Sequence, residues 1–154
     1  MQNNIFNTLK KKYFLTEKRF LGIDYGEVNI GVAVSDVGRQ IASPYAMLKN
    51  KNYKDLFPEI KKIIDEMDVA VVVLGLPLQM NGEEGETARK VRYFAKKLSE
   101  FIPEIDVVFV DERMTSAMSE KMLIRDFDLS RKKRKAILDK VAAAEILQRV
   151  LDAV

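Results

Sequence analysis

The strongest structural signal in this sequence lies in residues 20–36, which read FLGIDYGEVNIGVAVSD. The apolar run from Phe20 that ends in the carboxylate of Asp24 is typical of a buried strand, and residues 30–36 predict a second strand. Gly26 lies between the two runs, at a position that is typical of a tight turn. Because a tight turn reverses the chain, this stretch predicts an antiparallel strand pair.

Downstream of this pair, apolar spacing alternates between strand-like and helical patterns. Residues 40–48 predict a third strand, which Pro44 assigns to an edge of the sheet because proline has no N–H to donate to a neighbouring strand. Continuous apolar runs predict strands buried on both faces, and apolar residues three and four positions apart predict helices. The expected later elements are a helix over 53–67, a strand over 69–74, a helix over 84–101, a strand over 105–110 and helices over 115–125 and 131–151.

This order predicts an α/β fold whose mixed sheet is covered by helices on both faces. Tight turns make the first three strands antiparallel, whereas helical crossovers make the later strands parallel to one another and to the first. A chain of 154 residues fits a single domain with a core of useful size. We expect this domain to occupy residues 19–154, and we expect residues 1–18 to form an N-terminal extension.

The composition excludes several kinds of chemistry. The chain contains no cysteine and no histidine, which rules out thiolate catalysis, a Ser-His-Asp triad and imidazole ligands for zinc. Metal chemistry would therefore rest on oxygen ligands, which hard divalent cations prefer. The net charge of +3 is compatible with a nucleic-acid partner. No apolar run has transmembrane length and the N-terminus does not resemble a signal peptide, so a cytoplasmic location with no membrane partner is expected.

Polar residues follow three of the predicted strands where each strand ends. Asp24 ends the first strand, the loop 75–82 follows the strand over 69–74, and Asp111 and Glu112 follow the strand over 105–110. Ligands of open α/β sheets bind beyond the carboxyl ends of parallel strands, so these carboxylates converge if the strands are neighbours. Taken singly, Asp24 also fits an ordinary turn residue, and Asp111-Glu112-Arg113 also fits a helix start.

A fourth acidic residue lies in the last predicted helix. Asp139 shares one helical face with Ala142, Ala143 and Ile146, and the small alanines let this face approach the sheet closely. An acidic group on a buried face is costly unless a partner compensates its charge, and a divalent cation would do so. The alternative is an exposed ion pair between Asp139 and Lys135.

Four motifs together resemble the YqgF (RuvX) family, whose members are described as pre-16S rRNA nucleases and as Holliday junction resolvases. The first motif joins Asp24-Tyr25-Gly26 to the strand over 30–36. The other three are GLPLQMNG at 75–82, VDERMTS at 110–116 and DKVAAA at 139–144 followed by ILQ at 146–148. They follow in the family's order across residues 20–151.

The resemblance implies an RNase H-like fold with strand order 3-2-1-4-5 and a metal site formed by Asp24, Glu112 and Asp139. It also implies processing of the 5′ end of precursor 16S ribosomal RNA, in association with ribosomal precursor particles, with branched DNA as the rival substrate. Two departures from the family pattern stand out. Val28-Asn29 replaces the basic pair usually found before the Ile-Gly-Val-Ala stretch, and the extension over 1–18 is longer than usual.

Such a site would hydrolyse phosphodiester bonds with Mg²⁺ or Mn²⁺, as two ions about 3.5–4 Å apart can activate a water and stabilise the leaving oxygen. Asp24 would bridge the ions, and Asp111 is the second choice to Glu112 because adjacent strand residues point to opposite faces. Arg113 would bind phosphate or orient Glu112, and a structural ion pair is equally expected. Further substrate contacts are expected from Asn81 and Gly82 in the loop and from Lys132, Lys133 and Arg134 in the basic run.

Two other functions fit parts of the pattern. A binding protein with an inactive nuclease fold would keep the basic run without turnover. An ATP-binding relative of the actin-like kinases would share the opening strand pair, but a chain of 154 residues has no room for the second lobe that closes on the nucleotide.

Overall fold

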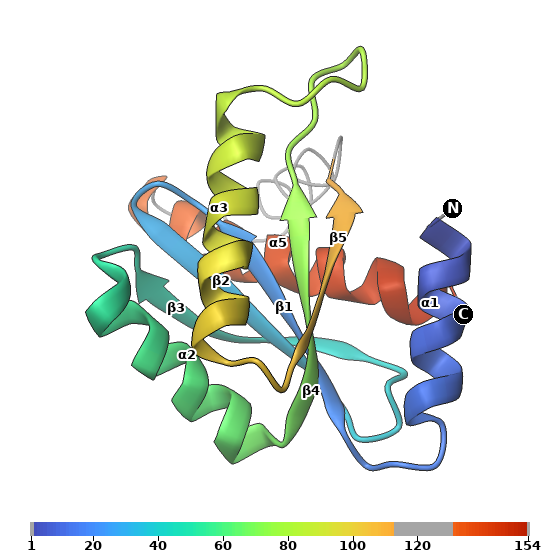
Figure 1. Cartoon of the computed structure of the whole chain (residues 1–154). Helices are drawn as coiled ribbons and strands as arrows, with labels where there is room; N and C mark the ends of the chain where they lie inside the picture. The colour runs from blue at the N-terminus through green and yellow to red at the C-terminus, as the bar shows by residue number, and fades with distance from the viewer. Residues whose placement is uncertain (1, 113–130, 154) are drawn as a thin grey trace.

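The computed structural model describes residues 2–112 and 131–153, and of residues 2–4, 10 and 131–139 it describes the backbone alone. Its centre is a five-stranded sheet of order β3-β2-β1-β4-β5 (Figure 1). The strands β1 (Arg19–Tyr25), β2 (Asn29–Ser35) and β3 (Ala42–Lys49) are antiparallel, and β4 (Val69–Leu76) and β5 (Asp106–Asp111) run parallel to β1. The predicted mixed sheet and its strand order are confirmed.

The third strand is an edge strand, as Pro44 predicts. Ala33 pairs with Pro44 and Val32 pairs with Ala46, so the register shifts at this point and β3 carries one extra residue. The strand starts at Ala42, two residues later than predicted. The reason is the preceding turn, where the Asp36 carboxylate accepts hydrogen bonds from the backbone N–H of Gln40 at 2.7 Å and of Ile41 at 3.0 Å.

Helices cover both faces of the sheet, as predicted. The helices α2 (Tyr53–Met67) and α3 (Glu86–Phe101) lie on one face, whereas α5 (Arg131–Asp152) lies on the other with α1 (Gln2–Tyr13) beside it (Figure 1). Helix α3 begins two residues later than predicted, because Glu84 forms a bridge with Leu78 in the preceding loop. The helix predicted over 115–125 lies outside the described residues.

Strand β4, which lies between β1 and β5, separates two hydrophobic clusters. Val72 and Leu74 belong to the cluster under α2 and α3, whereas Val71 and Val73 belong to the cluster under α5 and α1. All four side chains are fully buried. Because successive residues of a strand point to opposite faces, this burial explains why the sequence of β4 is continuously apolar.

Helix α5 packs closely on the sheet where small residues face each other. A methyl group added at Gly22 of β1 would lie 2.6 Å from the carbonyl oxygen of Ala143 and 2.8 Å from the Cβ of Leu147. Contacts this short do not occur between packed atoms, so glycine is required at this position. The close approach predicted from the alanines of α5 is therefore present.

Helix α1, in the segment predicted as an extension, packs against the core. Phe6 and Leu9 are each 6% exposed and join the cluster under α5. At the end of the helix, Lys12 and Tyr13 donate hydrogen bonds to Asp106 at the start of β5, at 2.9 and 2.7 Å. The apolar residues at 6 and 9 thus attach the helix to the domain by burial, and the two polar contacts fix its end.

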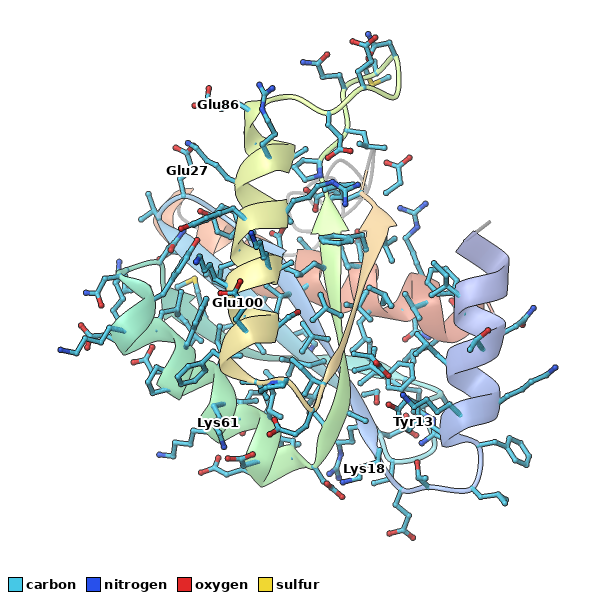
Figure 2. All side chains as sticks on the ribbon, in the orientation of Figure 1. Tyr13, Lys18, Glu27, Lys61, Glu86 and Glu100 are labelled. Atoms are coloured by element: carbon cyan, nitrogen blue, oxygen red, sulfur yellow. The ribbon has the colours of Figure 1, made fainter. Side chains whose placement is uncertain are left out.

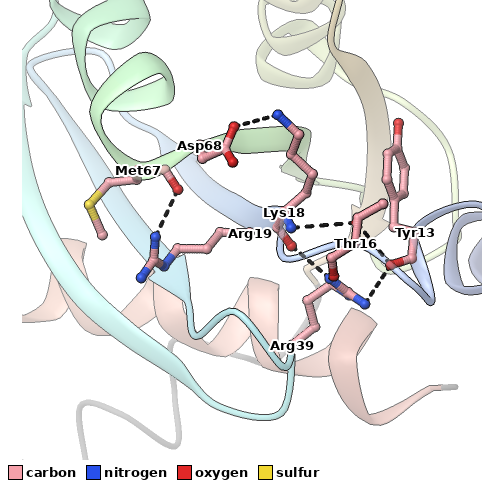
Figure 3. A network of polar contacts seen from close by, with 7 residues as sticks. All are labelled: Tyr13, Thr16, Lys18, Arg19, Arg39, Met67 and Asp68. Carbon is pink, nitrogen blue, oxygen red and sulfur yellow. Dashed lines mark hydrogen bonds and ion pairs between the residues drawn. The ribbon is translucent and has the colours of Figure 1, made fainter.

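The segment between α1 and β1 is held by the side chain of Arg39. Its guanidinium donates hydrogen bonds to the backbone carbonyls of Tyr13, Thr16 and Lys18, at 2.6, 3.0 and 2.8 Å (Figure 3). Hydrogen bonds from a charged donor are stronger than neutral ones, so these bonds tie the chain after α1 to the turn between β2 and β3. No helix within residues 2–112 and 131–153 combines the length and the apolar character needed to cross a membrane.

Candidate active site

The carboxyl ends of β1, β4 and β5 meet at one edge of the sheet. In the strand register, Ile23 pairs with Leu74 and Gly75 pairs with Val110. The backbone N–H of Glu112 continues this ladder, since it donates to the carbonyl of Leu76 at 3.2 Å. Asp24 at the end of β1 and Glu112 directly after β5 therefore lie at the same edge, on either side of β4.

Both carboxylates also lie on the α5 face of the sheet. Ile23 is buried under α2 and α3, so its neighbour Asp24 points toward α5. For Glu112, a methyl group added at Gly75 would be 2.6 Å from the Cδ1 of Ile146 and closer still to the Oε2 of Glu112. The Glu112 carboxylate thus lies directly over Gly75 and beside α5. Asp111 falls on the other face by strand alternation.

The electrostatics of the pair follow from this placement. Burial raises the pKa of Glu112, and the charge of Asp111 acts in the same direction. A hydrogen bond with Asp24 acts in the opposite direction and lowers the pKa of Glu112. Two carboxyl groups can share a hydrogen bond only if one of them holds a proton, so the pair is not fully ionised in this arrangement.

The other predicted residues of the metal and phosphate sites lie partly outside the described structure. Asp139 is in α5, one turn before Ala143, but its side chain lies outside the described residues. The same holds for the side chains of Lys132, Lys133 and Arg134 in the first turn of α5, and Arg113 lies wholly outside. Within the described part of the chain, no group of three acidic residues is placed to hold a metal ion.

Asn81 and Gly82 form the tip of a small hairpin that extends beyond β4. The hairpin is closed by a bridge between Leu78 and Glu84 and by a 2.8 Å hydrogen bond from the N–H of Gln79 to the carbonyl of Glu83. At the tip, the Asn81 side chain accepts from the N–H of Glu83 at 3.0 Å, and Gly82 has a φ of 86°. A positive φ favours glycine, so Gly82 is needed to shape the turn.

An ion pair that the sequence analysis missed attaches this hairpin to the domain. Arg92 of α3 binds Glu84, and its guanidinium lies over the ring of Phe109 in β5, 4.9 Å from the ring centre. Arg92 therefore links the hairpin to the strand that ends next to Glu112. Glu84 lies before the start of α3 and eight residues before Arg92. Helical spacing does not bring residues together across the bend that precedes the helix, so the sequence did not predict this ion pair.

Comparison with known proteins reveals relatives along nearly the whole chain. The model of a family described as RuvX, Holliday junction resolvase, matches residues 18–153. A protein from Endomicrobium trichonymphae with the name "Putative pre-16S rRNA nuclease" is 49% identical over 134 residues, which are 87% of this chain and 95% of that protein. A protein with the same name from Caldanaerobacter subterraneus subsp. tengcongensis is 44% identical, over 87% of this chain and 96% of that protein.

Solved structures share the fold at low sequence identity. RuvC of T. thermophilus in complex with a Holliday junction substrate has a TM-score of 0.53 and 15% identity, over 88% of this chain and 94% of that chain. The fowlpox virus Holliday junction resolvase has a TM-score of 0.51 and 17% identity, over 88% and 99% of the two chains. These likenesses, with the observed strand order, confirm the RNase H-like fold.

Proposed function

The chain belongs to the RuvX family of Holliday junction resolvases, and on this basis we propose that it is a metal-dependent nuclease that processes precursor 16S ribosomal RNA. The relatives at 49% and 44% identity carry the name of such nucleases over 87% of this chain. The structural observation that carries the proposal is the convergence of Asp24 and Glu112 at one sheet edge, with Glu112 lying over Gly75.

The donor chemistry of this edge fits a hard divalent cation. Asp24 and Glu112 offer only carboxylate oxygens, which are the ligands that Mg²⁺ and Mn²⁺ prefer. The raised pKa of Glu112 supports this fit, because burial and the charge of Asp111 make its negative charge unfavourable until a cation compensates it. We expect Asp139 of α5 to be the third ligand.

Mg²⁺ or Mn²⁺, when bound, would supply an activated water and stabilise the leaving oxygen of the phosphodiester. The protein's own residues would fix the geometry. Gly75 leaves the space in which the Glu112 carboxylate lies, and Ile146 covers it from the side of α5. Apolar cover of this kind limits the access of bulk water and strengthens the interaction between a carboxylate and a cation.

Substrate would be held by groups around this edge. We propose contacts from the hairpin through Asn81 and Gly82, and contacts to phosphates from Arg113, Lys132, Lys133 and Arg134. Phosphate contacts position a nucleic acid without reading its sequence, which suits recognition of a folded precursor RNA. We expect the activity in the cytoplasm, on ribosomal precursor particles.

A branched DNA junction is the second candidate substrate. The description of the family as a Holliday junction resolvase favours it. Both substrates contain phosphodiester bonds, so the same carboxylate edge could act on either.

The test incubates the purified protein and its Asp24→Asn variant with labelled precursor rRNA and with four-way DNA junctions, with and without Mg²⁺ or Mn²⁺. We expect the parent protein to cleave the RNA only when metal is present. The Asp24→Asn variant should not cleave it, and cooperative thermal unfolding of this variant should show that it is folded. Faster cleavage of the junction would assign the DNA substrate. Binding of both substrates without cleavage under any metal condition would show an inactive binding protein and contradict the proposal.

A further inference from the structure

Aromatic side chains line a groove between α2 and α3, on the sheet face opposite α5. The groove consists of two adjacent hollows of about 300 and 340 Å³, and Tyr53 of α2 lines both. We call it the α2–α3 groove. Its upper hollow is lined by Tyr25, Tyr53, Glu86, Arg89, Lys90 and Tyr93, and its lower hollow by Tyr53, Lys54, Phe57, Lys97, Glu100 and Phe101.

The rings of this groove are held by one another and keep exposed area. Tyr53 stacks on Phe57, with ring centres 4.5 Å apart and an angle of 11° between the ring planes. The ring centre of Tyr93 lies 6.2 Å from that of Tyr53. Tyr93 is 54% exposed and Phe101 is 44% exposed. Burial raises the pKa of Tyr53, and the nearby hydroxyls of Tyr25 and Tyr93 act in the same direction. Three tyrosines thus gather around the upper hollow.

Basic side chains line both hollows. Arg89 and Lys90 belong to the upper hollow, and Lys54 and Lys97 belong to the lower one. Lys90 binds Glu27 at 2.8 Å, and Lys97 lies 3.5 Å from Glu100 with its ammonium 5.5 Å from the ring centre of Tyr93. Figure 2 labels Glu86 and Glu100 of α3, and Glu27 in the turn between β1 and β2 beside this helix. These ion pairs are exposed, so a phosphate can replace the carboxylate at little cost.

The groove begins at the sheet edge that carries the candidate active site. Tyr25 directly follows Asp24 in β1, so their Cα atoms are about 3.8 Å apart. Because adjacent strand residues point to opposite faces, Asp24 points toward α5 and Tyr25 points into the groove. A nucleic-acid strand that crosses this edge can therefore contact the carboxylates and the groove at neighbouring nucleotides.

We propose that the α2–α3 groove binds an unpaired strand of the substrate, with bases stacked near Tyr53 and Tyr93 and phosphates bound by Arg89 and Lys54. The inference rests on the proposed nuclease function, because it assigns a path to the strand that leaves the cleavage site. Proteins bind single strands by combining stacking on aromatic rings with cations along the backbone, and this groove has both. A second copy of this chain fits less well, because the centres of protein interfaces are depleted of charged residues.

The test measures binding in EDTA, where no metal-dependent cleavage interferes. Fluorescence anisotropy compares a blunt duplex with a duplex of the same sequence that carries a single-stranded tail, in RNA and in DNA, with 2-aminopurine placed in the tail. We expect Tyr93→Ala to weaken binding of the tailed duplex about tenfold or more and to abolish quenching of the 2-aminopurine. Binding of the blunt duplex should not change.

Two matched variants separate stacking from general damage to the fold. Tyr93→Phe keeps the ring and should retain the affinity of the parent protein for the tail. Tyr45 is 40% exposed and lines neither hollow, so Tyr45→Ala should also bind as the parent protein does. The RNA and DNA tails show which kind of strand the groove prefers.

Equal affinity of the parent protein and Tyr93→Ala for the tail, with unchanged quenching, would overturn the inference. So would a sedimentation experiment in which Tyr93→Ala converts a dimer into a monomer while tail binding is unaffected, since that result assigns the groove to self-association. Tail-specific binding that depends on Tyr93 in a protein without cleavage activity would support the groove and contradict only the proposed nuclease function.

Discussion

The two ends of β5 carry carboxyl groups whose pKa values shift in opposite directions. At the start of the strand, hydrogen bonds from Lys12 and Tyr13 lower the pKa of Asp106. Directly after the end of the strand, burial raises the pKa of Glu112. The first carboxylate is matched by donors and supports the attachment of α1. The second is buried, and burial of its negative charge costs free energy in the metal-free protein, which a bound cation would offset.

The largest expected difference between the two ends is in catalysis. Glu112→Gln should lower turnover at least about a thousandfold, because loss of a metal ligand removes several kcal/mol of transition-state stabilisation. Asp106→Asn should leave turnover within about twofold, since this residue contacts α1 at the other end of β5. Asp111→Asn should fall between the two. Steady-state cleavage rates at saturating Mg²⁺ give the ranking, and a greater loss in Asp111→Asn would move the proposed ligand to the other residue.

A matched pair of glycines compares the same two ends of the sheet. Gly75→Ala places a methyl group 2.6 Å from Ile146 Cδ1 and against Glu112, whereas at Gly38, in the turn after β2, the nearest atom would be 3.4 Å away. We expect Gly75→Ala to cost about 1–3 kcal/mol of unfolding free energy and most of the activity, because overpacking displaces Glu112. Gly38→Ala should leave both the unfolding free energy and the cleavage activity nearly unchanged.

Urea unfolding and cleavage assays on the two variants test this expectation. If Gly75→Ala cleaves as fast as the parent protein, the position of the Glu112 carboxylate over Gly75 has no part in catalysis.

Removal of one carboxylate should also change how metal affects stability. In EDTA, Glu112→Gln should raise the melting temperature by roughly 2–4 °C, the shift that about 1 kcal/mol produces in a domain of this size. The same variant should lose the stabilisation that excess Mg²⁺ gives the parent protein, which is about 2.7 kcal/mol at a concentration of one hundred times Kd. Melting curves with EDTA and with Mg²⁺ measure both effects.

Asp139→Asn should repeat this behaviour if Asp139 completes the site, and Asp106→Asn should keep the full response to Mg²⁺. An equal metal-dependent shift in the parent protein and in Asp139→Asn would assign Asp139 to an exposed ion pair instead.

The smallest expected effect concerns the partnered end of β5. The pKa of Asp106 is lowered in the folded protein, so its contribution to stability is present above the unfolded pKa of about 3.9 and is lost as the pH falls through the folded pKa. The Asp106 side chain is 38% exposed, and we therefore expect Asp106→Asn to cost less than about 1 kcal/mol at pH 7. Chemical denaturation should show a lower unfolding free energy for Asp106→Asn than for the parent protein at pH 7, and equal values at pH 2.5. A difference that persists at pH 2.5 would mean that packing of α1, and not the charge, is affected.

Local patterns predicted the elements of the sheet because each pattern reports burial directly. The continuous apolar sequence of β4 reflects two buried faces, and Pro44 marks an edge because it has no N–H to donate. Helix α2 runs over Tyr53–Met67, the predicted range, because its apolar spacing and its N-cap at Asn52 agree. The packing of α1 on the core did not follow from its sequence. Apolar residues such as Phe6 and Leu9 in a lysine-rich segment do not show which surface of the domain they will cover.

By itself the sequence determined the strands, their parallel or antiparallel directions, the acidic residues available and the absence of histidine and cysteine ligands. These properties depend on residue type and on spacing along the chain. The tertiary structure decided that Glu112 lies over Gly75 near Asp24, that Arg92 over the ring of Phe109 binds Glu84 of the hairpin, and that Tyr53 and Tyr93 line one groove. Each of these contacts joins residues from different elements. Their positions depend on how the helices pack on the sheet, which no single stretch of sequence encodes.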